Sequence, residues 1–180
     1  MKQVKQSILQ YLEESIRNIP DFPKEGIQYK DITTLLNDSD ALKLTSDMLK
    51  RPFLNEDVDF VVGIESRGFL FGPRLAQDLD AGFIPVRKPG KLPAKKVSVE
   101  YELEYGTDIL ELHEDALSKG DRIIIHDDLI ASGGSAKATT ELVEKLGAHV
   151  VGYSFITELT ALNGISKLQQ DAIIDALISL

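Results

Sequence analysis

Cysteine is absent from this 180-residue chain, as are long apolar runs and any excess of basic residues. The lack of cysteine excludes disulfides, zinc sites built on thiolates and catalysis by a cysteine nucleophile. No apolar run approaches the roughly 20 residues of a membrane-spanning helix, and the N-terminus lacks the apolar core of a signal peptide. The sequence therefore predicts a cytoplasmic protein without a membrane partner.

Acidic residues outnumber basic ones by 29 to 20, which gives a formal net charge of −9 at pH 7. Such a charge provides no general attraction for nucleic acid. The histidines, at 113, 126 and 149, are too far apart in the sequence to suggest a metal cluster. With 43% hydrophobic residues the chain can bury one full core, so we expect a single domain over residues 1–180.

Short apolar strands alternate with helical patterns along most of the chain. Strands are predicted over 58–64, 82–86, 122–125 and 149–156, and helices over 3–18, 40–50, 69–79 and 136–147. This alternation is typical of βαβ units, so we expect an α/β fold: a doubly wound, mostly parallel sheet with helices on both faces. The apolar tail fits either a final strand or a final helix.

Residues 87–112 interrupt the alternation. A rigid basic turn is followed by two stretches, 97–103 and 108–112, in which apolar and polar side chains alternate. The pattern predicts an exposed antiparallel hairpin, which we call the hood. A long excursion of this kind in a compact domain is more often a lid or a binding loop than a plain connector.

Residues 123–135 place two carboxylates, Asp127 and Asp128, and a turn of small residues between a buried strand and a helix. Backbone N–H groups and the positive dipole end of a helix N-terminus attract anions, and glycine lets the backbone approach a phosphate closely. The segment therefore indicates a site for a phosphorylated sugar. The alternative is an ordinary acidic turn with a serine at the helix N-cap.

Charged residues follow several of the predicted strands, and the carboxyl ends of parallel strands meet at one edge of a sheet. In an acidic protein, a cluster such as Arg87, Lys88 and Lys91 indicates an anion site, although a solvated basic turn is the alternative. Arg67 follows another strand, where a surface ion pair with Glu65 is the alternative to anion binding.

Two anion sites beside a carboxylate pair match the charges of a ribose with phosphates at both ends. Asp127 and Asp128 would accept hydrogen bonds from vicinal hydroxyls, and at least one should face the cleft because adjacent residues in a strand alternate sides. Mg²⁺ prefers oxygen ligands and usually shares them with substrate phosphates, so it would neutralise a pyrophosphate here, with Asp127 or Asp128 as a candidate ligand. Helix capping or solvation is the alternative role for this pair.

Over residues 19–168 the chain resembles the adenine branch of the type I phosphoribosyltransferase family. The last of its motifs resembles the signature shared by all type I members, and the others look specific to the adenine branch. The motifs are PDFP at 20–23 with Gly26, DIT at 31–33, GIESRGF at 63–69, RKPGKLP at 87–93, LEYG at 103–106 and DDLIASGGS at 127–135.

The resemblance implies transfer of a phosphoribosyl group from 5-phosphoribosyl 1-pyrophosphate to adenine, which gives AMP and pyrophosphate. It also implies Mg²⁺ and a homodimer. By position, the 5′-phosphate would be held by Ala131, Ser132, Gly133, Gly134 and Ser135, and the ribose hydroxyls by Asp127 and Asp128. The pyrophosphate-side cations would be Arg67, Arg87, Lys88 and Lys91, some acting across the dimer interface.

The remaining roles implied by the resemblance concern the hood and the base. In the hood, Glu104 would handle the purine N7 proton, and Tyr105 beside it would bind 5-phosphoribosyl 1-pyrophosphate or AMP. Gln28 and Lys30 would present backbone atoms to adenine from a base-facing segment within residues 1–35, and Leu129 would pack on the ring. His126 stands where the family usually has an apolar or small residue. It either perturbs the aspartates electrostatically or, as we favour, is a core histidine with a backbone partner.

Other functions fit parts of this pattern. A regulator that senses ribosyl pyrophosphate would typically add a DNA-binding domain and lose the hood carboxylate, whereas this acidic chain has Glu104. A receiver domain would need its acidic pair after the first strand, and the pair here leads directly into a glycine turn. A nucleotide kinase is disfavoured because the phosphate-binding pattern Gly-x-x-x-x-Gly-Lys-Ser/Thr is missing.

Overall fold

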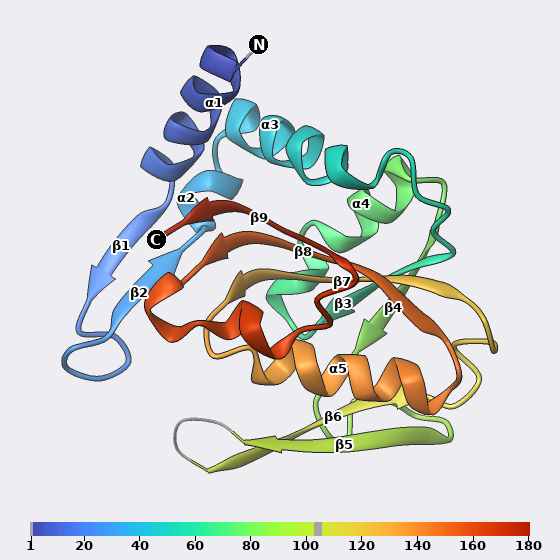
Figure 1. The fold of residues 1–180 in the computed structure, drawn as a ribbon. Helices are drawn as coiled ribbons and strands as arrows, with labels where there is room; N and C mark the ends of the chain where they lie inside the picture. The colour runs from blue at the N-terminus through green and yellow to red at the C-terminus, as the bar shows by residue number, and fades with distance from the viewer. Residues whose placement is uncertain (1, 103–105) are drawn as a thin grey trace. The chain divides into compact units, whose positions relative to one another are not determined.

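The computed structural model describes residues 2–102 and 106–180 (Figure 1). The chain divides into two compact units, residues 1–48 and 49–180. In the part of the chain that the structure describes, no helix combines the length and the apolar character needed to cross a bilayer.

The N-terminal unit combines helices with a small sheet. Helix α1 (Lys2–Glu14) leads into strand β1 (Arg17–Pro20), which pairs antiparallel with β2 (Gln28–Asp31). Helices α2 (Thr33–Leu36) and α3 (Ser39–Leu49) follow, and α3 confirms the helix predicted over 40–50. The helix predicted over 3–18 ends at Glu14, because residues 17 and 18 belong to β1. This strand also includes residues 19 and 20, which were predicted to lie in a loop.

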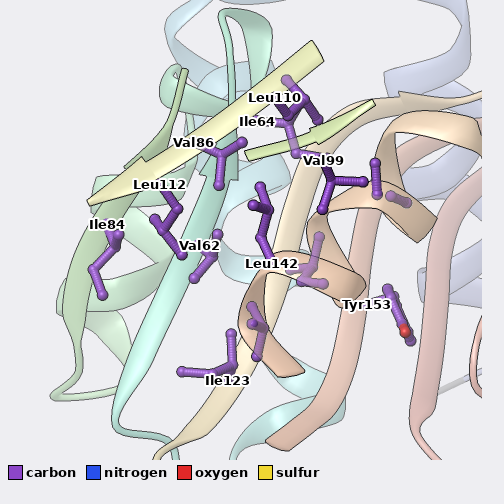
Figure 2. Close-up of a cluster of buried hydrophobic side chains, with 14 of the residues drawn as sticks. Val62, Ile64, Ile84, Val86, Val99, Leu110, Leu112, Ile123, Leu142 and Tyr153 are labelled. Atoms are coloured by element: carbon purple, nitrogen blue, oxygen red, sulfur yellow. The ribbon is translucent and has the colours of Figure 1, made fainter. Parts of the chain in front are cut away.

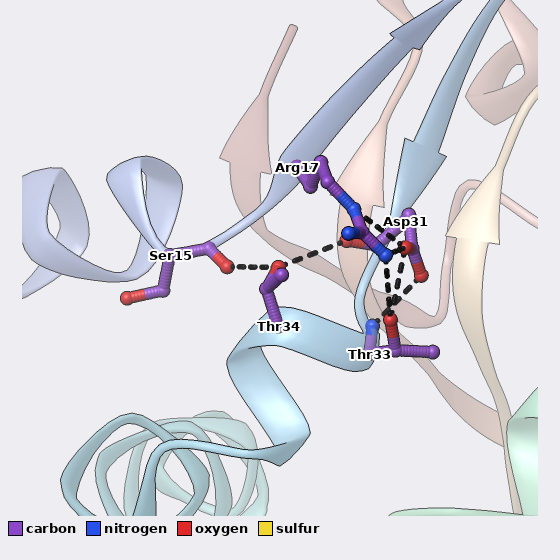
Figure 3. A network of polar contacts seen from close by, with 5 residues as sticks. All are labelled: Ser15, Arg17, Asp31, Thr33 and Thr34. Carbon is purple, nitrogen blue, oxygen red and sulfur yellow. Dashed lines mark hydrogen bonds and ion pairs between the residues drawn. The ribbon is translucent and has the colours of Figure 1, made fainter.

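A polar network fixes the end of β2 in this unit (Figure 3). The Asp31 carboxylate accepts hydrogen bonds from Arg17 Nε at 3.0 Å and from the backbone N–H and hydroxyl of Thr33, each at 2.9 Å. These bonds, led by that from Arg17, lower the pKa of Asp31 to about 2. The Thr34 hydroxyl donates to the Ser15 carbonyl at 2.7 Å. The network thereby ties β1 and β2 to the turn that follows α1.

The larger unit is built on a parallel sheet. The strand order is β4 (Gly82–Val86), β3 (Phe60–Ile64), β7 (Arg122–Ile130), β8 (His149–Glu158) and β9 (Ile173–Ser179), and every neighbouring pair is parallel. The chain runs outward from β3 to β4 and then returns to β7 on the other side of β3. Ligands of open α/β sheets bind beyond the carboxyl ends of the strands at such a switch point. Strand β9 also settles the structure of the C-terminal tail.

Helices cover both faces of this sheet, as predicted. On one face, Val62, Ile123 and other strand residues form a core cluster with Leu142 of α5 (Gly134–Lys145) (Figure 2). On the other face, Gly72 of α4 (Gly72–Asp78) lies directly against the ring of Phe83. Figure 1 shows α4 and α5 on opposite sides of the strands. The expected doubly wound architecture is confirmed.

The predicted hood is an antiparallel hairpin of β5 (Lys96–Glu102) and β6 (Thr107–His113). One of its faces is packed rather than exposed, because Val99 and Leu110 join the core cluster around α5. The Lys145 ammonium donates to the Ser98 carbonyl at 2.9 Å, and a β-bridge joins Arg87 to Glu111. The hood is therefore attached to both α5 and the end of β4.

Two predicted boundaries in this unit are wrong in ways that affect the site. Strand β7 continues past Ile125 to Ile130, so Asp127 and Asp128 lie within the strand and not in the turn. The helix predicted from Phe69 begins only at Gly72, because η2 (Arg67–Phe69) forms a separate short turn of 3-10 helix. A similar turn, η1 (Arg51–Phe53), precedes β3, and η3 (Thr160–Leu162) and η4 (Gly164–Lys167) link β8 to β9.

Candidate active site

A cleft of about 420 Å³ lies at the carboxyl ends of β3 and β7, which is the switch point of the sheet. Its lining brings together predicted residues from separate parts of the sequence: Arg67, Asp127, Leu129 and residues 131–135. Polar and anion-attracting groups therefore converge on one concave surface, which is the usual form of a small-molecule site.

The two aspartates have different surroundings. Asp127 lines the cleft, whereas Asp128 is only 1% exposed, and Arg67 Nε lies 3.2 Å from its Oδ1. Burial, reinforced by the charge of Asp128, raises the pKa of Asp127 well above its ordinary value. Burial also raises the pKa of Asp128, although the Arg67 charge opposes that shift. The site thus holds two carboxyl groups whose charged forms are costly without a ligand.

Strand pairing holds these carboxylates in place. Asp127 is paired with Phe155 of β8, and the Thr157 hydroxyl donates to the Asp128 carbonyl at 3.2 Å. The Asp128 backbone N–H also donates to Asp127 Oδ1 at 2.9 Å. Both aspartates are therefore part of the sheet itself, on β7 where this strand pairs with β8.

The position of Arg67 depends on a close approach between its turn and β7. A Cβ added to Gly68 would lie 2.6 Å from the His126 carbonyl oxygen, which is closer than real Cβ atoms come. Only glycine allows the turn to pack this tightly, and the packing holds Arg67 beside Asp128.

His126 is a buried residue of the core. Its exposed fraction is 0%, its Nδ1 lies 3.4 Å from the Ser154 hydroxyl, and burial lowers its pKa to about 4. The ring is therefore neutral at pH 7 and places no positive charge beside the aspartates. This result favours the interpretation of His126 as a core histidine.

The small-residue loop owes its two glycines to contacts within the chain. Gly133 caps α5 with a φ of +77°, and a Cβ there would overlap the carbonyl oxygen of Gly164. A Cβ on Gly134 would lie 3.1 Å from the Glu102 carbonyl oxygen and 3.3 Å from the Tyr101 ring. A side chain at Gly133 would thus distort the loop itself before it could exclude a phosphate.

Gly164 and Tyr101 are not among the residues that the sequence predicted for the site. Both touch the loop through packing between distant parts of the chain, and neither belongs to a local motif that could have identified it. The loop is thus supported from η4 on one side and from the hood on the other.

The basic turn at residues 87–93 lies outside the cleft lining, and carboxylates lie close to its positive charges. Arg87 Nε donates to Glu65 at 3.0 Å, and the Lys88 backbone N–H donates to the same carboxylate at 2.7 Å. Although burial opposes it, these bonds lower the pKa of Glu65. The Lys88 ammonium is paired with Asp108, which raises the pKa of Lys88 and lowers that of Asp108. Lys91 adds its charge to the field at Glu65.

The predicted base-facing residues lie on β2 of the N-terminal unit. Gln28 is exposed, and its side-chain oxygen accepts a hydrogen bond from Asn18 Nδ2 at 2.9 Å. Lys30 is half-buried and precedes Asp31, the residue that fixes the strand end. The predicted hood residues Glu104 and Tyr105 lie outside the described residues.

The carboxylates fit a magnesium ion that is shared with a ligand. Within residues 2–102 and 106–180 there is no group of three or more His, Asp or Glu side chains that could hold a metal alone. Both oxygens of Asp128 are buried without a hydrogen-bond partner, and Asp127 lines the cleft. Mg²⁺ is commonly bound by one or two carboxylates together with substrate phosphates, which agrees with this donor set.

Known proteins resemble this chain in both sequence and structure. Residues 31–161 match the model of the phosphoribosyl transferase domain family. An adenine phosphoribosyltransferase of Picosynechococcus sp. is 57% identical over 159 residues, which cover 87% of this chain and 92% of the relative.

Two solved structures superpose over nearly the whole chain. The adenine phosphoribosyltransferase of Rhodothermus marinus has a TM-score of 0.92 and 49% identity, covering 97% of this chain and 99% of its own. The adenine phosphoribosyltransferase of Saccharomyces cerevisiae, solved with an imino-altritol bisphosphate and adenine, has a TM-score of 0.89 and 43% identity, with coverage of 96% and 99%.

Proposed function

The chain belongs to the adenine phosphoribosyltransferase family, and we propose which of its residues carry out each part of the family's reaction. Members of this family are purine-salvage transferases that make AMP and pyrophosphate from adenine and 5-phosphoribosyl 1-pyrophosphate. The observation that carries the proposal is the cleft at the switch point, where a helix N-terminus, a glycine loop and two carboxylates lie together.

The phosphoribosyl half of the donor occupies this cleft. Residues 131–135 offer backbone N–H groups and the hydroxyls of Ser132 and Ser135 to the 5′-phosphate at the N-terminus of α5. Asp127 and Asp128 accept hydrogen bonds from the two ribose hydroxyls. Donor binding thereby supplies hydrogen-bond donors to the Asp128 oxygens, which have none in the protein alone.

The pyrophosphate half meets the cations Arg67, Arg87, Lys88 and Lys91. Arg67 already lines the cleft, and the other three lie on the turn after β4. Asp127 or Asp128 would hold a Mg²⁺ ion, which would supply positive charge against the leaving pyrophosphate.

The chemical step replaces the bond between ribose C1 and the pyrophosphate oxygen with a bond from C1 to adenine N9. The transition state resembles an oxocarbenium ion, as in glycoside cleavage, so the protein mainly positions the reactants and stabilises leaving-group charge. Adenine loses the proton on its N7 atom in this step, and the Glu104 carboxylate accepts that proton. The hood excludes water, which would otherwise hydrolyse the donor, and Tyr105 binds the donor or AMP.

For the base we propose contacts from the backbone of Gln28 and Lys30 and from the side chain of Leu129. Support comes from the anchored end of β2 and from the place of Leu129 in the cleft lining. A homodimer and a cytoplasmic location stay predictions, and light scattering of the purified protein measures the first of them.

A Mg²⁺-dependent assay with a panel of bases tests the proposed function. The wild-type protein is offered 5-phosphoribosyl 1-pyrophosphate with adenine, hypoxanthine, guanine, uracil or orotate, and pyrophosphate release is measured. We expect turnover with adenine alone and none after chelation of the metal. Turnover with another base would overturn the base assignment, and no turnover with any base would overturn the proposed reaction.

A further inference from the structure

Glu111 of β6 is a buried carboxylate on the outer face of the hood, and the reaction described above makes no use of it. Its neighbours Leu110 and Leu112 are 0% exposed and belong to the core cluster (Figure 2). Successive side chains of a strand point to opposite faces, so Glu111 points away from that core. Only 6% of Glu111 is nevertheless exposed. Another part of the chain must therefore cover this side chain.

The basic turn at residues 87–93 provides this cover. The backbone N–H and carbonyl of Glu111 are hydrogen-bonded to the backbone of Arg87, at 2.8 and 2.9 Å. The Gly90 N–H donates to Glu111 Oε2 at 3.2 Å, and the Lys96 ammonium donates to the same oxygen at 2.7 Å. Glu111 thus holds the turn at two points, while a cation from β5 offsets its charge.

Gly90 is the position at which the turn can flex. Pro89 has a fixed φ, whereas Gly90 has a φ of +78° and nothing within 4 Å of an added Cβ. Glycine loses more conformational freedom on ordering than any other residue, so a hydrogen bond to its N–H helps to fix the turn. On the other side of Pro89, the Lys88 N–H donates to the Glu65 carboxylate at 2.7 Å. Glu65 and Glu111 therefore hold the backbone on both sides of the proline.

We propose that Glu111 is a positioning residue that keeps the basic turn in shape for pyrophosphate. The inference rests on the function proposed above, in which Arg87, Lys88 and Lys91 meet this group. A turn that is ordered before the anion arrives loses less entropy on binding. The Lys96 ammonium offsets the repulsion that the Glu111 carboxylate would otherwise exert on an anion nearby.

Two substitutions separate the hydrogen bond to Gly90 from the charge of Glu111. Glu111→Gln removes the charge but keeps a side-chain oxygen that can accept from the Gly90 N–H. Glu111→Ala removes both. Loss of a negative charge beside an anion site should by itself strengthen pyrophosphate binding, in both variants. Positioning predicts the opposite sign for alanine, because the turn then loses its anchor.

Calorimetric titration with pyrophosphate and Mg²⁺, and separately with AMP, tests the inference. Pyrophosphate affinity should fall about 3- to 10-fold in Glu111→Ala, as for one lost hydrogen bond, whereas Glu111→Gln should bind pyrophosphate at least as tightly as wild type. AMP affinity should stay unchanged in both variants, because AMP carries no pyrophosphate group. Glu114→Ala is the matched control, since it removes an exposed carboxylate just beyond β6 and should bind both probes as wild type does.

Each other outcome is decisive. Pyrophosphate binding that is unchanged or tighter in Glu111→Ala would overturn the proposal, and so would an equal loss of affinity for both probes. A loss in Glu111→Gln as large as that in Glu111→Ala would show that the charge matters and not the anchored turn. A wild-type protein that binds AMP but no pyrophosphate would also overturn the inference. If the wild-type protein bound neither probe, the proposed function itself would fail, and the two failures are therefore distinguishable.

Discussion

Gly133 and Gly164 are packed so tightly that a Cβ on either one would overlap backbone atoms of the other. Gly164 begins η4, which lies beyond β8 in the sequence, and Gly133 is the N-cap of α5. The small-residue loop (residues 131–135) is therefore shaped by a contact between two glycines from different connections of the sheet.

Gly133→Ala should destabilise the protein more than Gly120→Ala does. Both residues have a positive φ, at +77° and +94°, so both variants suffer backbone strain of about 1 kcal/mol, whereas only Gly133 has a neighbour within 4 Å. Overpacking should cost Gly133→Ala about 1–3 kcal/mol more in unfolding free energy and should weaken binding of the donor. Urea denaturation measures the difference, and equal costs would show that Gly164 does not constrain the loop.

Asp127→Asn should stabilise the protein in the absence of ligand and impair catalysis. Burial raises the pKa of Asp127, so the charged carboxylate destabilises the folded state at pH 7. We expect the substitution to raise the unfolding free energy by about 0.5–2 kcal/mol, as is usual where function conflicts with stability. The gain should shrink as the pH falls toward 3.8, the ordinary pKa of an aspartate, because Asp127 then becomes protonated in both the folded and the unfolded wild-type protein. A gain that does not vary with pH would contradict this explanation.

Glu104→Gln should lower kcat by roughly 10²-fold, the lower range for a lost general acid or base, and leave donor affinity nearly intact. Glu100→Gln is the matched control, because Glu100 is an exposed carboxylate on the same hood. Steady-state kinetics with varied donor and adenine give both constants. Unchanged turnover in Glu104→Gln would remove this residue from the mechanism.

Asp31→Asn should destabilise the N-terminal unit by about 1–2 kcal/mol at pH 7, because it weakens the charge-assisted bonds from Arg17 and Thr33. The folded pKa of Asp31 is lowered to about 2, so its contribution is fully present above 3.8 and is lost as the pH falls through 2. The difference from wild type should therefore narrow only below about pH 4.

Two further measurements make the Asp31 experiment decisive. Asp57→Asn, at an exposed aspartate, should change stability little across the same pH range. If β2 carries the base contacts, Asp31→Asn should also raise the KM for adenine more than that for the donor. A larger effect on the donor would argue against the base role of Gln28 and Lys30.

The sequence was informative where the signal is local. The alternation of apolar strands with helical patterns predicted the parallel sheet, and the alternation of apolar and polar residues predicted the hairpin. For β4 (Gly82–Val86) even the bounds were predicted. Local pattern failed at β7, because two acidic residues look like the end of a strand although strand pairing continues to Ile130. The contacts from Gly164 and Tyr101 to the loop join residues at least 30 positions apart, and one sequence alone carries no record of them.

Because Asp127 and Asp128 belong to a paired strand, their backbone has no freedom left to lose when a ribose binds. The conformational entropy of aligning the two carboxylates is lost on folding, so ligand binding requires ordering only of side chains and of the ligand. Backbone amides of Asp127 and Leu129 should accordingly exchange with solvent as slowly as those of the central sheet, with or without substrate. If the proposed sugar contacts hold, any motion that accompanies catalysis must take place around a carboxylate-bearing strand that is already rigid.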